Sequence, residues 1–91
     1  MDVKVVTAEG VPIDGAVVSL CSVPNNGFVP EIASITDDQG MASVICEHVK
    51  GEYVFSVYTD LHGVTKISVT LSGKKKDLPV VLNVTPKTET T

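Results

Sequence analysis

The sequence predicts an all-β protein, a seven-stranded antiparallel sandwich of two sheets. Its 91 residues are 43% hydrophobic but only 4% aromatic, and the apolar residues are mostly Val, Ile, Leu and Ala. β-Branched residues are heavily represented among them and pack well on pleated sheets. Good helix formers never recur at a 3.6-residue spacing for more than a turn. Turn residues return at near-regular intervals between short apolar runs, which is typical of a sandwich.

Four strands are expected in the first half of the chain, at residues 3–7, 16–23, 31–36 and 41–46. The segments between them contain Gly, Pro, Asp or Asn, the residues that make turns between consecutive antiparallel strands. Because side chains alternate between the two faces of a strand, one set is expected to point inward: Val3, Val5, Ala16, Val18, Leu20, Ala42, Val44 and Cys46.

Three strands are expected in the second half, at residues 52–59, 64–71 and 78–84. Gly51 precedes the first of them, residues 60–63 turn the chain into the second, and residues 73–77 form a last hairpin with Lys74, Lys75 and Lys76 at its solvated tip. The same alternation predicts a further inward set: Tyr53, Phe55, Val57, Ile67, Val69 and Leu71.

Length and charge restrict the classes of function. The chain is expected to form one domain, residues 1–85, followed by a Thr-rich linker or tail, residues 86–91. The net charge is −4 and all seven basic residues are Lys, so the bidentate Arg contacts of nucleic-acid readers are missing and no nucleic-acid partner is expected. No apolar run approaches the ~18 residues of a membrane span, and none resembles a signal peptide.

Three motifs carry a resemblance to a known group of domains. Residues 10–20 read Gly-x-Pro-Ile-x-Gly-Ala-x-Val-x-Leu, residues 36–40 read Thr-Asp-x-x-Gly, and residues 51–57 read Gly-x-Tyr-x-Phe-x-Val. This pattern resembles the bacterial Ig-like and prealbumin-like modules, which include invasin-type repeats, Cna-B-type repeats and the carboxypeptidase regulatory-like domain. The resemblance covers residues 3–84 and implies an Ig-like or prealbumin-like Greek key without catalytic activity.

Two chemistries of this group are not expected here. Cna-B-type repeats often join a Lys to an Asn through an isopeptide bond that a buried acid promotes, and Lys4 and Asn83 are the matching pair. Val57 stands where the acid would be, and alternation turns Lys4 away from the core, so no bond is expected. Transthyretin-like hydrolysis uses Arg, which this chain lacks.

No metal, cofactor or catalytic site is predicted. His48 and His62 are expected in surface turns, Tyr53 in the core and Tyr58 on the opposite face of the same strand, with no His spacing that presets a metal geometry. No nucleophile motif accompanies any Ser or Cys.

Calcium is considered for the acidic turns. Asp37, Asp38 and Asp60 are too few and too scattered for a loop that supplies six or more oxygens. An Asp at the start of a turn is expected to bond its own backbone instead. For the two cysteines, alternation places Cys46 inward and Cys21 outward, so free thiols are favoured over a disulfide.

The loop 24–30 is the candidate contact surface, with Pro24, Asn25, Asn26, Phe28 and Val29 as its contact residues. The alternative is a hydrophobic plug over one end of the core. The leading hypothesis for function is a structural stalk, spacer or display module of a bacterial surface or secreted protein, monomeric in isolation, with neighbouring modules of the same chain as partners. A protein- or carbohydrate-binding accessory module that uses the loop is the alternative; without Trp, a protein ligand is favoured over a glycan.

Overall fold

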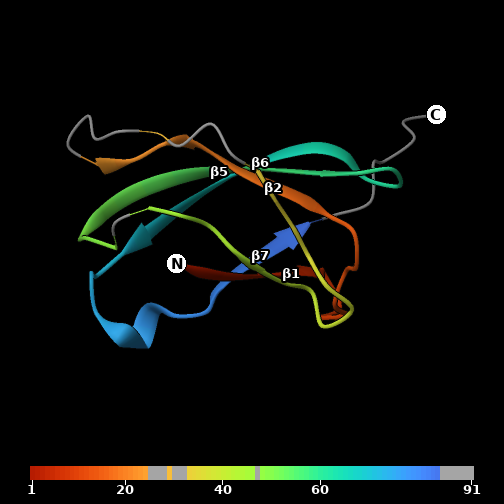
Figure 1. The fold of residues 1–91 in the computed structure, drawn as a ribbon, viewed down its shortest axis with the longest axis horizontal. Coiled ribbons are helices and arrows are strands. Elements are labelled where there is room, and N and C mark those ends of the chain that lie inside the picture. Colours follow the sequence, from red (N-terminus) through yellow and green to blue (C-terminus); the bar gives the residue numbers. More distant parts are fainter. Residues whose placement is uncertain (25–28, 30–32, 47, 85–91) are drawn as a thin grey trace.

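A computed structural model describes residues 1–24, 29, 33–46 and 48–84 and has the predicted all-β architecture of two packed sheets (Figure 1). One sheet has three strands in the order β4-β1-β7 and the other has four in the order β3-β2-β5-β6. The strands are β1 (Asp2–Thr7), β2 (Val17–Ser22), β3 (Ser34–Ile35), β4 (Met41–Ser43), β5 (Gly51–Thr59), β6 (Gly63–Leu71) and β7 (Val80–Val84). All seven predicted strands are therefore present, and most boundaries agree within two or three residues.

One pairing differs from the antiparallel expectation. β1 pairs with β7 in parallel over five residues, from Val3 opposite Val80 to Thr7 opposite Val84. The remaining strand pairs, β1 with β4, β2 with β3, β2 with β5 and β5 with β6, are antiparallel. The expectation failed because the first and last strands are joined by the whole intervening chain, so no turn between them fixes their direction.

The core confirms the predicted alternation. The inward side chains of β1, β2 and β5 are almost fully buried, and β7 adds Val80, Leu82 and Val84. The predicted inward residues Ile67 and Val69 of β6, and Cys46 beyond β4, are only half-buried at the edge of this core. β6 is an edge strand of the four-stranded sheet, which explains why its inward side chains are only partly buried.

The turns at residues 10–15 and 36–40 do not make hairpins. They carry the chain from β1 to β2 and from β3 to β4, and each step crosses from one sheet to the other. Thr36 joins the two turns: its Oγ1 accepts a hydrogen bond from the Ala16 N–H at 2.8 Å and donates to the Ile13 carbonyl at 2.6 Å. Its backbone also bonds Gly15 and Ala16. Thr36 is buried, and although it begins the Thr-Asp-x-x-Gly motif, that motif did not predict its bonds to the other turn.

Gly40 explains why the second turn must end in glycine. Its φ is +76°, and a Cβ at this position would lie 2.6 Å from the Val5 carbonyl oxygen. The Gly40 carbonyl accepts a hydrogen bond from the Val5 N–H at 2.8 Å. The turn therefore lies directly on β1, where only a residue without a side chain fits.

The prediction of a last hairpin at residues 73–77 is wrong. β6 and β7 lie in different sheets, and the segment between them contains the 3₁₀ helix η2 (Lys75–Asp77). Asp77 fixes this crossover by accepting hydrogen bonds from the backbone N–H groups of Ser72, Gly73 and Lys74 and from the Ser72 hydroxyl. The three lysines are solvent-exposed, as expected.

Because β1 and β7 are parallel, the chain runs along both in the same direction (Figure 1). We call the end of the sandwich where both strands begin the N-terminal pole, and the end where both finish the C-terminal pole. Met1 lies at the N-terminal pole, where its amino group donates to the Val44 carbonyl. Thr7, Val84 and the turn between β5 and β6 lie at the C-terminal pole.

Candidate functional site

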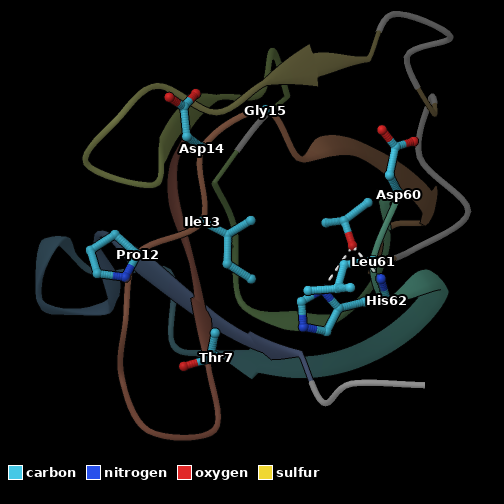
Figure 2. Close-up of a pocket in the computed structure, with 9 residues that line it drawn as sticks. Thr7, Pro12, Ile13, Asp14, Gly15, Asp60, Leu61 and His62 are labelled. Carbon is cyan, nitrogen blue, oxygen red and sulfur yellow. Dashed lines mark hydrogen bonds between the residues drawn. The ribbon is translucent and has the colours of Figure 1, made fainter. Parts of the chain in front are cut away.

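A hollow at the C-terminal pole is the candidate site that the fold itself provides. It has a volume of about 520 Å³ and lies between the β1–β2 segment and the β5–β6 turn. Its lining consists of Thr7, Pro12, Ile13, Asp14, Gly15, Thr59, Asp60, Leu61 and His62. Figure 2 shows Ile13 and the His62 ring pointing toward one another across the hollow, with Asp14 and Asp60 well apart at its rim.

His62 is buried, so the expectation of a surface histidine is wrong for this residue. The cause is a local turn: the Thr59 hydroxyl accepts the His62 backbone N–H at 2.8 Å and lies 2.9 Å from the ring Nδ1 (Figure 2). A Thr hydroxyl that bonds the backbone three residues on closes a turn. These contacts of the Thr59 hydroxyl therefore stabilise the turn between β5 and β6, and they engage the hydroxyl within that turn.

The hollow has few groups that could carry out chemistry. The Thr59 hydroxyl lies next to the His62 ring, but no third group among the described residues bonds that ring to orient it as a base for nucleophilic catalysis. Among the described residues, no three His, Cys, Asp or Glu side chains gather closely enough to hold a metal ion. What the site offers is an open surface of mixed polar and apolar side chains with two separated carboxylates.

The predicted contact loop falls mostly outside the described residues: Asn25, Asn26 and Phe28 belong to that part of the chain. Pro24 and Val29 are described and are half-buried. Pro24 packs on Gly51 at the start of β5, where a Cβ would lie 2.5 Å from the Pro24 Cβ, and Val29 packs against the core. The loop is thus held at Pro24 and Val29. That it forms a contact surface, or alternatively a hydrophobic plug over the core, stays a prediction.

Lys4 and Asn83 lie on the outer face of the three-stranded sheet. In the ladder between β1 and β7, Lys4 is opposite Val81 and Asn83 is opposite Val6. The Asn83 side-chain amide donates to the Thr7 carbonyl at 3.3 Å. Val57, at the position where the resemblance would place a promoting acid, is buried in the core of the sandwich.

His48, the other histidine, lies 2.8 Å from Asp77, between its Nε2 and the carboxylate Oδ2. Partial desolvation acts to raise the pKa of Asp77, but the hydrogen bonds from His48, Ser72 and the backbone of Gly73 and Lys74 outweigh it and lower the pKa to about 2. This contact joins the segment before β5 to the β6–β7 crossover. It is a structural pair at the N-terminal pole, remote from the hollow.

The cysteines and the acidic turn lie where the sequence placed them. Cys21 is exposed at a β-bulge, since Leu20 pairs with Phe55 and Ser22 already pairs with Val54. Cys46 is half-buried against the core, and this burial raises the pKa of its thiol despite the nearby N-terminus, which lowers it. Asp37 accepts the backbone N–H groups of Gln39 and Met41, as predicted for a turn residue.

No protein-family profile matches the chain, and no curated protein sequence matches it. Within the described part of the chain, no helix has the length and apolar character that crossing a bilayer requires.

Proposed function

We propose that this chain is a non-catalytic structural module, a spacer or stalk unit that carries load between its two ends. The observation that supports this proposal is the parallel pairing of β1 with β7. The chain enters β1 at one pole and leaves β7 at the other, and β5, which runs the length of the sandwich, spans roughly 30 Å at ~3.3 Å per residue.

The direction of the ladder determines how it responds to tension. Force applied to Met1 and Val84 pulls β1 and β7 past one another, so the hydrogen bonds of all five register pairs are loaded together. Force applied at one pole would instead separate the strands one pair at a time. A module that is joined to its neighbours in series through these ends would therefore be pulled in the direction in which it resists unfolding most strongly.

The resemblance to prealbumin-like and Cna-B-type modules supports the same function. In immunoglobulin constant domains the strands divide as A-B-E-D and C-F-G, whereas here β1 shares a sheet with β4 and β7 and β2 lies in the other sheet. We therefore retain the prealbumin-like part of the resemblance. A bacterial surface or secreted protein, with neighbouring modules of the same chain as partners, is the setting that we infer from it.

Single-molecule force spectroscopy tests the proposal. The domain is unfolded through handles at residues 1 and 84 and, as a matched control, at residues 1 and 76. Lys76 is exposed in the β6–β7 crossover, at the same pole as Met1. Pulling at residues 1 and 76 therefore separates β1 from β7 one register pair at a time. We expect the first geometry to unfold at clearly higher force at the same loading rate. Equal forces, or a stronger control, would contradict the spacer function.

A further inference from the structure

A row of apolar side chains crosses the outer face of the four-stranded sheet. Each strand contributes one residue in direct register: Ile35 of β3 opposite Val17 of β2, Val17 opposite Tyr58 of β5, and Tyr58 opposite Val64 of β6. We call these four residues the apolar row. Ile35 is 68% exposed, Tyr58 45% and Val64 64%, so the row faces solvent across the full width of the sheet.

Beyond the row this face is mostly polar, with the half-buried Val54 of β5 opposite Ser22 and Ser68. At the next outward level Ser19 is opposite Ser56, and Ser56 is opposite Lys66. The apolar row is therefore confined to the C-terminal pole, beside the exposed Leu61 of the β5–β6 turn. Its exposed side chains amount to roughly 400 Å², a size at which apolar patches on soluble proteins often mark interaction sites.

The geometry points to a second copy of this chain as the partner, bound face to face about a two-fold axis that lies along the apolar row. In this arrangement each side chain of the row packs on its own equivalent, as in an isologous interface. The strands of the two sheets stay aligned with one another, which is a common way for two sheets to pack. The row contains no charge, so this stacking opposes no like charges along it.

Charges on either side of the row fit this axis. Asp60 lies two residues beyond Tyr58 in the turn, and Lys66 lies two residues from Val64 on the opposite side of the row. The Tyr58 hydroxyl donates to the Asp60 carboxylate at 3.2 Å, which keeps Asp60 on the outer side of the sheet. A two-fold axis along the row reverses the strand direction, so Asp60 of each copy lies over Ser56 of the other, beside Lys66 on the neighbouring strand. Two complementary charge pairs result.

The patch is small for a stable dimer. A standard interface buries about 800 Å² on each partner, twice the exposed area of the row. We therefore expect a dissociation constant on the order of 0.1–1 mM. The chain is then a monomer at micromolar concentration, and it pairs where many copies are held close together.

Sedimentation velocity of the intact chain from 0.02 to 2 mM tests the proposal, together with five variants. Val64→Lys and Ile35→Lys place a charge against its own equivalent at opposite ends of the row and are expected to abolish association. Val81→Lys is the matched control, since Val81 is 52% exposed on the outer face of the other sheet. Lys66→Asp is expected to weaken the dimer at least tenfold, and the double exchange Asp60→Lys/Lys66→Asp is expected to restore it. Circular dichroism of each variant verifies that it is folded.

Four results would overturn the proposal. A wild-type chain that stays monomeric up to 2 mM has no such interface. A dimer that Val81→Lys disrupts, or that both Ile35→Lys and Val64→Lys leave intact, uses another surface. The last result is a dimer that survives Ile35→Lys and in which the β6 backbone amides become protected from hydrogen exchange. Such a dimer would form through the free edge of β6 and not through the apolar row.

Discussion

Thr36→Val tests whether one side chain holds the two sheet-crossing turns together. Valine matches the shape of threonine but cannot bond, so the buried Ala16 N–H and the Ile13 carbonyl would lose their partner. A buried polar group without a partner costs about 1–3 kcal/mol. Since Ile13 is only half-buried, we expect a total destabilisation of about 2–4 kcal/mol.

For a domain of this size 1 kcal/mol corresponds to about 4–8 °C in the melting temperature, so Thr36→Val is expected to melt about 8–32 °C below the wild type. Thermal unfolding followed by circular dichroism measures the change. Thr36→Ser keeps the hydroxyl and loses one methyl group, and it is expected to cost only about 1 kcal/mol. Thr70→Val, on the exposed face of β6, is expected to change little. The reasoning is refuted if Thr36→Val melts within 3 °C of the wild type, or if Thr36→Ser is equally unstable.

Three further predictions concern other parts of the fold. Gly40→Ala is expected to cost at least about 2 kcal/mol, because positive φ and the 2.6 Å approach to the Val5 carbonyl both oppose a side chain; urea unfolding measures the loss, and an unchanged midpoint would count against the turn geometry. The depressed pKa of Asp77 stabilises the fold fully above pH 4, so the melting temperature should fall between pH 4 and pH 2, where the folded pKa lies, and Asp77→Asn should flatten this part of the profile. Iodoacetamide should modify the exposed Cys21 before the half-buried Cys46, whose thiol pKa is raised; mass spectrometry of partial digests gives the order, and equal rates would contradict it.

Local features of the fold could be predicted from the sequence because their causes are local. Alternation in β1, β2 and β5 places Val5, Val18 and Phe55 inside, and the burial of all three follows from a period of two residues. The turn at Asp37 likewise follows from a side chain that bonds its own backbone. Neither feature depends on where the rest of the chain lies.

Sheet membership could not be predicted in the same way, because it depends on contacts between residues far apart in the sequence. Val3 and Val80 are 77 residues apart, yet they are opposite one another in the ladder that makes β1 and β7 parallel. The same lack of local signal hid the β6–β7 crossover, since a Gly- and Lys-rich segment looks alike in a hairpin and in a link between sheets. The burial of His62 depends on a turn closed by Thr59, which no periodicity marks.

The candidate site shows the same limit. The loop that the sequence favoured is described only at Pro24 and Val29, while the hollow at the C-terminal pole is formed by two turns about fifty residues apart. The apolar row also becomes visible only in register, because Ile35, Val17 and Tyr58 come from three separate strands. Alternation could place each residue outward, but only the strand order places them side by side.

Two-dimensional NOE spectroscopy of the β1–β7 ladder tests the central claim most directly, namely that the first and last strands run in the same direction. The parallel register predicts cross-strand contacts between Val3 and Val80 and between Thr7 and Val84. Contacts between Val3 and Val84, with none between Val3 and Val80, would mean that the two strands are antiparallel, with β7 beginning at the pole where β1 ends. That result would contradict the account.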